Sequence, residues 1–381
     1  MARNIIICCD GTDNQFGASN TSVVRLAQVA VQDPNRQIVY YDPGVGTLPE
    51  TSARSKIAQT LSQLKAQAFG TDIDDKVCVA YGHLMEFWEP GDQVFIFGFS
   101  RGAYTARVLA GLLYSLGLLP RGNQHLLPYV IRIFKSLKSN TDGYWELCNN
   151  FRWSFARPIP GDDERRFPIH FVGLFDTVSS VGWIWNPTKY QYTFRNPGLT
   201  TVRHAVALDE RRAFFRQNLF GNVDGQDLLE MWFAGVHSDV GGGYSEADGG
   251  LWRVTFEWML AEARNGGLLV DPDRLQKVLN RTTPPGNPWA EPQHESLKGV
   301  WWIGEVFPKH VYDALTKSYR WKLNLGRHRT VPQGALLPRA VLERLRLPTY
   351  SPPNLSENFK AKVRALPSLP DSLNYDSKPH T

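Results

Sequence analysis

The residues best suited to chemistry in this sequence are a serine, an aspartate and a histidine that each follow an apolar run. Ser100 lies in the segment GFSRG (98–102), between the apolar run VFIF and a segment with helical spacing. A G-x-S-x-G pattern in this setting is typical of a nucleophile elbow, where the serine sits at the tip of a sharp turn. Glycines flank such a serine because side chains at positions 98 and 102 would collide with neighbouring chain. The pattern predicts a nucleophilic Ser100, and the alternative is a tight strand-to-helix turn that happens to contain serine.

A serine hydroxyl needs a general base, and the base needs an acid that orients it. Asp176 follows the run HFVGLF and His237 follows EMWFAGV, which gives the chain order Ser, Asp, His. Because the carboxyl ends of parallel strands meet at one edge of a sheet, we expect these side chains to lie together there. The alternatives are a capping or turn role for Asp176 and a hydrogen-bonded loop role for His237.

Two other histidines compete for the role of base. His204 lies in RHAVALDERR, a dense charge cluster that favours a structural role. His294, in QHESLKG, comes late in the chain, where such a base can lie, but no apolar strand precedes it. We therefore expect His237 to be the base and keep His294 as the rival.

Backbone donors for an oxyanion are expected on either side of the serine. A helix that begins at Arg101 would point its first N–H groups toward the nucleophile. The run IIICC ends at Asp10, Gly11 and Thr12, at the same expected sheet edge. We expect Gly11 or Thr12 to supply a second N–H, with Asp10 fixing the loop. A phosphatase D-x-D-G-T motif is disfavoured because Cys8 stands where its nucleophile would be.

The sequence predicts no cofactor and no metal. It contains no G-x-x-x-x-G-K-[ST] phosphate loop, and the segment DPGVGT lacks the lysine. His237 and Asp239 form H-x-D, which is weak support for a metal because no second ligand cluster is in view. Asp10 and Phe99 are instead expected to face a substrate.

The elements that would position these residues alternate between strands and helices. Strands that are buried on both faces and alternate with helices predict a three-layer α/β fold with a mostly parallel sheet. The apolar runs predict strands at 5–9, 38–41, 93–98, 169–175 and 230–236, and helical spacing predicts helices at 21–32, 72–88, from 101 onward and at 255–264.

The intervals between these elements are unusually aromatic. Residues 118–165 and 179–228 are predicted as insertions above the C-terminal edge of the sheet, with Trp183, Ile184 and Trp185 as walls of an acyl pocket or lid. The whole chain has 12 Trp, 14 Tyr and 20 Phe, which favours a large core over a lipid- or acyl-binding surface. We expect one domain over 1–345 and an extended or disordered tail over 346–381.

Composition limits the compartment and the partners. The net charge of +5 and the absence of a basic run give no footprint for nucleic acid. Four cysteines without a C-x-x-C pair argue against a disulfide framework or a zinc site. The N-terminal apolar stretch is too short for a signal peptide, and no segment is long enough to span a membrane. Synthesis in the cytoplasm is predicted, with export that needs no signal peptide left open.

Six motifs together resemble a known family. They are CCDGTDNQFG, YYDPGVGT, GFSRGAYTARVLAGLL, GLFDTVSSVG, RHAVALDERRAFF and WFAGVHSDVGGGY, in the order found in Tle-type phospholipase effectors of type VI secretion. The resemblance covers about residues 3–305 of the catalytic domain of that family, formerly a bacterial and fungal domain of unknown function. It implies an α/β-hydrolase fold and hydrolysis of phospholipid acyl esters. The catalytic residues of the family carry over onto Ser100, Asp176 and His237.

The expected function is therefore a serine hydrolase that cleaves carboxylic esters of lipids through a Ser-His-Asp triad. A non-lipid carboxylesterase or thioesterase is one alternative, and an inactive hydrolase fold that binds a partner is another. The expected partner is a lipid or other ester substrate, without nucleic acid. Peripheral contact with a membrane, and an immunity or secretion-carrier protein, stay open as further partners.

Overall fold

The protein is built around one eight-stranded sheet in the order β12-β11-β8-β7-β4-β3-β1-β2. The computed structural model describes residues 2–11, 17, 19–44, 71–136, 143–178, 182–183, 186–187, 190–245, 248–280, 287–299, 301–306, 309–313 and 318–376. The sheet strands are β1 (Asn4–Cys9), β2 (Gln37–Asp42), β3 (Gln93–Phe99), β4 (Ile169–Phe175), β7 (Leu199–Ala207), β8 (Asp227–Phe233), β11 (Leu336–Pro338) and β12 (Ser372–Asn374). All neighbours pair in parallel except β11 and β12.

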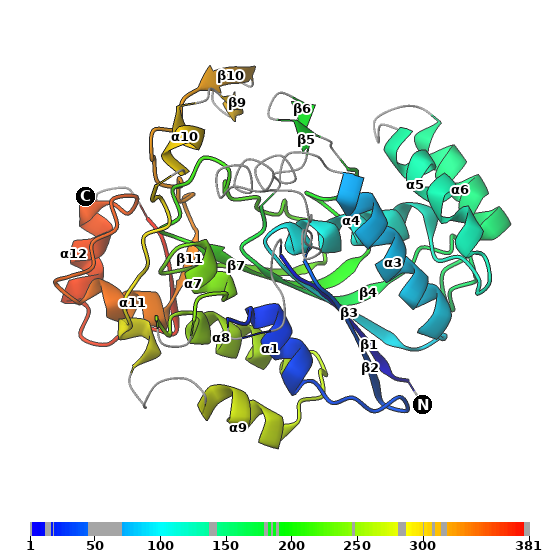
Figure 1. The fold of residues 1–381 in the computed structure, drawn as a ribbon, viewed down its shortest axis with the longest axis horizontal. Helices are drawn as coiled ribbons and strands as arrows, with labels where there is room; N and C mark the ends of the chain where they lie inside the picture. Colours follow the sequence, from blue (N-terminus) through cyan, green and yellow to red (C-terminus); the bar gives the residue numbers. More distant parts are fainter. Residues whose placement is uncertain are drawn as a thin grey trace, which may run out of the picture.

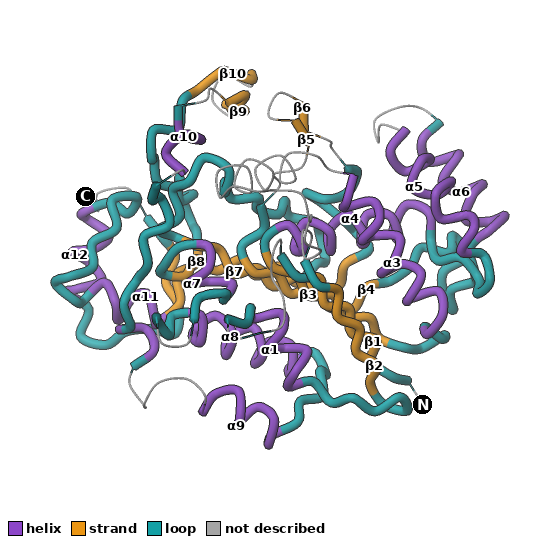
Figure 2. Tube along the Cα trace, viewed as in Figure 1, coloured by secondary structure: helices purple, strands orange, loops and turns teal. Residues whose placement is uncertain are grey.

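Helices cover both faces of this sheet, which forms a continuous band through the middle of the molecule (Figures 1 and 2). One face carries α3 (Thr71–Phe87), α4 (Arg101–Leu116), α5 (Leu127–Ser136) and α6 (Tyr144–Phe155), and the other carries α1 (Ser22–Val29), α8 (Trp252–Asn265) and α9 (Pro272–Asn280). Helices α11 (Arg339–Leu345) and α12 (Glu357–Ala365) pack beside β8 and β11. The mostly parallel α/β architecture predicted from the sequence is confirmed.

The remaining elements are short helices and two strand pairs that are separate from the main sheet. They are η1 (Gln124–Leu126), α7 (His237–Gly241), η2 (Pro288–Ala290) and α10 (Trp301–Glu305), with the strand pairs β5 (Gly182–Trp183) with β6 (Asn186–Pro187) and β9 (Lys309–Asp313) with β10 (Ser318–Lys322). Within the described ranges, no helix combines the length and the apolar character that crossing a bilayer requires.

The first strand shows why the continuous apolar runs become strands. Ile5, Ile7 and Cys9 pack into the core under α3 and α4, whereas Ile6 and Cys8 pack into the core under α1 and α8. Because successive side chains of a strand point to opposite faces, a strand that is covered on both sides needs apolar residues at every position.

The strand register places the ends of β1, β3 and β4 side by side. Cys9 pairs with Gly98, and Phe99 pairs with Phe175. The residues that leave these strands therefore emerge next to one another. Because β1 lies between β2 and β3, the chain also departs in opposite directions at this point, which is where open α/β sheets form their ligand crevice.

A central strand lies inside the interval 179–228 that the sequence predicted as an insertion. β7 pairs with β4 on one side and β8 on the other. Its sequence LTTVRHAVA carries Arg203 and His204, which interrupt the apolar pattern. Both are buried because they are paired: Arg203 binds Asp227 and Glu262, and His204 binds Glu230. The presence of β7 in the sheet corrects the predicted insertion. The strand was missed because its buried charges are paired with residues of other elements, which the periodicity of the sequence does not show.

The predicted C-terminal tail over 346–381 is also corrected, because it contributes to the core as far as it is described. Helix α12 begins after Ser356, whose hydroxyl accepts a hydrogen bond from the N–H of Phe359. Strand β12 closes the sheet next to β11. Apolar side chains spread thinly among prolines and serines are buried here, with at most 6% exposure: Tyr350, Leu355, Phe359, Val363, Leu369 and Tyr375. Their burial offsets the weak local helix and strand signals.

Candidate active site

Ser100 lies on a strained turn between β3 and α4. Its backbone has φ 59° and ψ −124°, a conformation that residues other than glycine rarely adopt. A Cβ on Gly98 would lie 2.6 Å from the Cα of Ala103, and a Cβ on Gly102 would meet the backbone of Cys9 and Asp10. The steric reason for the two glycines therefore holds in the structure, and it brings the loop after β1 against the start of α4.

Asp176 leaves β4 beside Ser100 and also has a positive φ, of 39°. Its buried carboxylate accepts four hydrogen bonds. Oδ1 accepts from the N–H of Ala207 at 2.9 Å and from Arg329, and Oδ2 accepts from His237 at 2.5 Å and from Arg329 at 3.0 Å. Burial opposes the charge, but the Arg329 guanidinium and the His237 bond outweigh it, so the pKa of Asp176 lies well below its ordinary value.

His237 is the first residue of α7, which begins four residues after β8 ends. The predicted strand 230–236 is thus shifted toward the N-terminus, and a short turn carries the histidine back over the sheet edge. The ring nitrogen Nδ1 lies 2.5 Å from Asp176 Oδ2. In a neutral imidazole, the proton on Nδ1 is then donated to the carboxylate and Nε2 is left as an acceptor. This is the tautomer that a general base needs.

Two aromatic rings hold the imidazole from either side. The ring of Phe99 stacks on His237 with centroids 4.6 Å apart, and the ring of Phe215 meets it edge-on at 4.8 Å. Phe99 is only 3% exposed and its ring also lies against Gly241. Its expected contact with a substrate stays a prediction. Burial lowers the pKa of His237, although the hydrogen bond to Asp176 acts in the opposite direction. The site thus favours the neutral histidine at pH 7.

Ser100 is linked to Asp176 and His237 indirectly, through contacts of the residues next to them. The N–H of Ser100 donates to the carbonyl of Phe175, which precedes Asp176, and Phe99 connects Ser100 to His237. Among the described residues, no hydrogen bond links the Ser100 hydroxyl to His237 directly. A serine–histidine bond of this kind often tightens only when substrate is bound. The structure gathers the three predicted residues at one sheet edge, and their catalytic roles stay a prediction.

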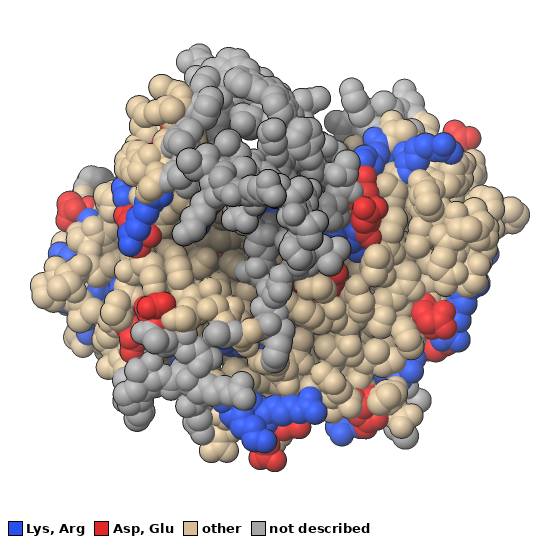
Figure 3. Space-filling view, in the orientation of Figure 1, with Lys and Arg blue, Asp and Glu red and all other residues tan. Residues whose placement is uncertain are grey.

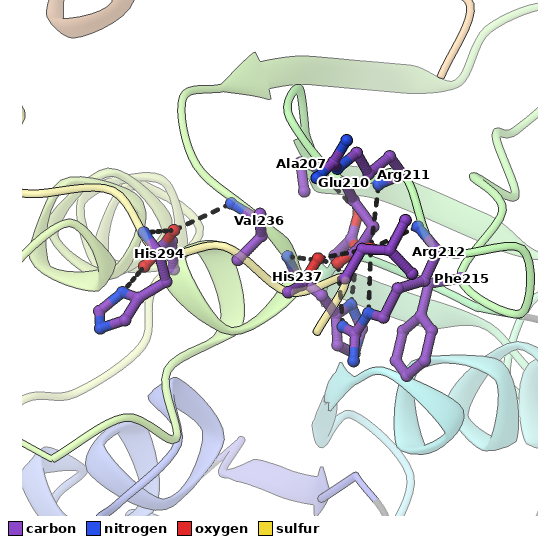
Figure 4. Close-up of polar contacts among 12 residues, drawn as sticks. Ala207, Glu210, Arg211, Arg212, Phe215, Val236, His237 and His294 are labelled. Atoms are coloured by element: carbon purple, nitrogen blue, oxygen red, sulfur yellow. Dashed lines mark hydrogen bonds and ion pairs between the residues drawn. The ribbon is translucent and has the colours of Figure 1, made fainter. Parts of the chain in front are cut away.

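Glu210 is a buried carboxylate behind the histidine (Figure 4). It accepts hydrogen bonds from the backbone N–H of His237 at 3.1 Å, from Arg212 at 2.9 and 3.0 Å, and from Ser296 at 2.9 Å. Burial raises the pKa of Glu210, but Arg212 outweighs this and lowers the pKa to about 2. The charge cluster in RHAVALDERR thus fixes the start of α7, a role that the sequence alone did not identify.

The other two histidines belong to different contacts. His294 lies apart from His237 in Figure 4, with Nδ1 2.6 Å from Asp239 and its ring stacked on Tyr244. His204 accepts the N–H of Thr177 at Nε2, so its Nδ1 donates to the carboxylate of Glu230 at 2.7 Å. His204 therefore supports the loop that follows the predicted acid, and His294 contacts a separate carboxylate.

The predicted oxyanion donors are only partly described. Arg101 begins α4, so its N–H lies in the first turn of the helix, next to Ser100. Gly11 donates its N–H to Asp10 Oδ1 at 2.7 Å, while Asp10 Oδ2 accepts from Thr21 and Tyr41 at 2.8 and 2.9 Å. Asp10 thus links Gly11 to Thr21 and Tyr41, and it engages the N–H of Gly11, which was one of the two expected donors.

Several predicted residues fall outside what the structure describes. These are Thr12, Ile184, Trp185 and the side chain of Trp183, whose backbone lies in β5. Their expected roles at the oxyanion and the acyl pocket therefore stay predictions.

The H-x-D segment does not converge on one point. His237 turns to Asp176, whereas Asp239 turns to His294. Over the described part of the chain, no three His, Cys, Asp or Glu side chains are grouped as metal ligands would be. On the face shown in Figure 3, basic and acidic side chains are interspersed around the periphery.

A family model supports the assignment suggested by the motifs. The family described as "T6SS, Phospholipase effector Tle1-like, catalytic domain" matches residues 3–262. An uncharacterized protein of Saccharomyces cerevisiae, YEL023C, is 36% identical over 229 residues, which are 57% of this chain and 33% of that protein.

Two solved structures are also similar. One is an uncharacterized protein from Pseudomonas aeruginosa, with a TM-score of 0.43, 21% identity and coverage of 74% of this chain and 48% of that chain. The other is the Tle1 effector bound to the VgrG spike of the type VI secretion system, with a TM-score of 0.35, 20% identity and coverage of 66% and 53%. The chain thus spans between a third and about half of the length of these relatives. Because the family model covers more than half of the chain, the protein belongs to the Tle1-like family of type VI secretion phospholipase effector catalytic domains.

Proposed function

We propose that this protein is a serine hydrolase that cleaves the acyl esters of lipids, with Ser100, His237 and Asp176 as its triad. The observation that carries the proposal is the 2.5 Å contact between Asp176 and His237 at the strand edge where the strained Ser100 emerges. Membership of a phospholipase family supports the lipid ester as substrate.

The proposed reaction follows from the roles of these groups. His237 Nε2 takes the proton of Ser100 Oγ as this oxygen attacks the acyl carbonyl. The resulting imidazolium is stabilised by Asp176, and it then protonates the departing alcohol oxygen. Water attacks the acyl-serine with His237 again as base, which releases the fatty acid and restores the hydroxyl. The low pKa of Asp176 keeps its carboxylate charged throughout.

An oxyanion forms in both halves of this reaction and needs donors fixed in advance. We assign one donor to the N–H of Arg101 at the start of α4. The loop after β1 is the expected source of the second, because the backbone of Asp10 abuts Gly102. Thr12 is favoured over Gly11 for this role, since the Gly11 N–H is directed to Asp10.

A covalent probe tests the nucleophile without assuming a substrate. A fluorophosphonate forms a phosphorus–oxygen bond with an activated serine and releases fluoride, and mass spectrometry of the peptides locates the adduct. We expect modification of Ser100 in the wild type and none in Ser100→Ala. Ser154→Ala, which alters an exposed serine on α6, is the matched control and should be modified like the wild type. Modification that persists in Ser100→Ala would overturn the triad.

A substrate panel separates the remaining alternatives. We expect phospholipid and long-chain ester hydrolysis by the wild type that is lost in Ser100→Ala. Turnover confined to short esters or to thioesters would favour the non-lipid enzyme. A folded protein with neither probe modification nor turnover would favour the inactive binding fold.

A further inference from the structure

An arginine from the C-terminal region contacts the predicted acid of the triad. Arg329 lies beyond residue 262, where the family match ends, and its side chain is 1% exposed. Nη1 and Nη2 each donate to one oxygen of Asp176, at a separation of 153 residues along the chain. A two-pronged guanidinium–carboxylate pair fixes both distance and plane.

The hydrogen bonds around this pair are complete on both sides. A carboxylate has about four lone-pair sites, and Asp176 fills them with Ala207, His237 and the two Arg329 nitrogens. The remaining N–H groups of the guanidinium donate to the carbonyls of Ala207 and Phe215. The carboxylate therefore cannot rotate without breaking a buried bond, and the arginine cannot shift without losing several.

The backbone of Arg329 is anchored as well. Asn354 donates from Nδ2 to the carbonyl of Leu208 at 2.8 Å and to the carbonyl of Arg329 at 3.1 Å. One side chain from the segment after α11 thus ties the arginine to the end of β7. The C-terminal region contributes to the site through this bridge as well as through the core.

We infer that Arg329 is a positioning residue, which holds the Asp176 carboxylate toward His237. The guanidinium also offsets part of the negative charge of this carboxylate. His237 is therefore kept neutral until Ser100 gives up its proton. The kinetic consequence rests on the proposed function, whereas the consequence for His237 does not. The charged and titratable groups around His237 are Asp176, Glu210 and Arg212. Next to Asp176 and Arg329 there are also His204, Glu210 and Arg216.

The direction of the effect follows from charge. With Arg329 present, the negative charge of Asp176 is divided between the guanidinium and the imidazole. Without it, the buried carboxylate has only His237 as a cationic partner, so the imidazolium is favoured and the pKa of His237 rises. A protonated histidine cannot act as the base, and the loss is recovered at higher pH.

The test uses Arg329→Gln and Arg329→Lys in the full chain. Lysine keeps the charge but not the planar fork. Arg203→Lys is the matched control, because Arg203 is also buried and pairs with two carboxylates on the sheet, Asp227 and Glu262. The pKa of His237 is read by NMR of protein labelled in histidine, with His237→Gln to assign its signals. This reading needs no substrate.

We expect the pKa of His237 to rise most in Arg329→Gln, which removes the charge, and less in Arg329→Lys, which keeps a charge but loses the two-pronged contact. Arg203→Lys should leave the pKa of His237 unchanged. In ester hydrolysis, kcat at pH 7 should fall about a hundredfold, with little change in KM, and the acid limb of the pH profile should move to higher pH. If Arg329→Gln does not fold, Arg329→Lys decides the outcome.

Two results would overturn the inference. One is a wild-type His237 that is mainly protonated at pH 7. The other is a folded Arg329 variant whose His237 pKa and kcat both match those of Arg203→Lys, which would leave Arg329 a structural role only. Absence of turnover in the wild type would instead contradict the proposed function, and the NMR titration would still report on Arg329.

Discussion

Replacing Gly102 by alanine places a methyl group against the backbone at the end of β1. The new Cβ would lie 2.6 Å from the carbonyl carbon of Asp10 and closer still to the carbonyl oxygens of Cys9 and Asp10. Ordinary van der Waals contact begins at 3.4 Å, so the carbonyl carbon of Asp10 must move away by about 0.8 Å and the two nearer oxygens by more than that. The alternative of a side chain moving aside does not exist here, because every near neighbour is backbone.

Two opposing contributions set the size of the effect. Alanine is favoured over glycine in a helix by about 1 kcal/mol, whereas overpacking costs about 1–3 kcal/mol. We expect the clash to dominate because β1 is hydrogen-bonded to a strand on each side and cannot move alone. If α4 moves instead, Ser100 moves with it, and a displacement near 1 Å can lower a rate about a hundredfold.

The assay compares the rate of fluorophosphonate modification of Ser100 with the melting temperature. We expect Gly102→Ala to slow modification about a hundredfold and to lower Tm. Gly82→Ala on α3 is the control, because its Cβ would meet only Leu127 Cδ1 at 3.9 Å. That variant should gain about 1 kcal/mol and keep the modification rate. Wild-type modification and Tm in Gly102→Ala would refute the steric account of the elbow.

Three further predictions address the base, a buried acid and the C-terminal region. His237→Ala should abolish the fluorophosphonate modification of Ser100, whereas His294→Ala should retain it. In the wild type, modification should decline only as the pH falls through the lowered pKa of His237. Loss of modification in His294→Ala alone would reassign the base. Burial raises the pKa of Asp209 to about 6, so this residue stabilises the fold at low pH and the contribution disappears as the pH rises through 6. Relative to Asp209→Asn, the urea unfolding free energy of the wild type should thus fall by about 3 kcal/mol between pH 4 and 7, and parallel curves would contradict this. A chain that ends at residue 345 loses six buried side chains, and burial of each stabilises the fold by about 1.5–3 kcal/mol. Thermal melting followed by circular dichroism should therefore show no cooperative transition. A cooperative transition like that of the full chain would show that this region is dispensable.

Much of the candidate site could be predicted because its signals are local. A glycine on each side of Ser100 reflects contacts made within one turn, and the apolar runs before Ser100, Asp176 and His237 mark where three strands end. Parallel pairing then brings those ends to one edge of the sheet. The ends of the strands could not be predicted as well. Strand β8 ends at Phe233, and a short turn that the periodicity does not show leads from there to His237.

The sequence by itself determined strands β1, β2, β3 and β4 and the approximate place of β8, the strained turn at Ser100 and the three candidate catalytic side chains, because backbone strain and burial on both faces act on consecutive residues. Only the tertiary structure decided that Asp176 pairs with His237 while Asp239 pairs with His294. The tertiary structure alone also placed Arg329 at the site, next to Asp176, which lies 153 residues away along the chain. The physical reason is that a buried charge is tolerated only where an opposite charge meets it, and the partner is chosen by folding in space, with no trace in the spacing of residues along the chain.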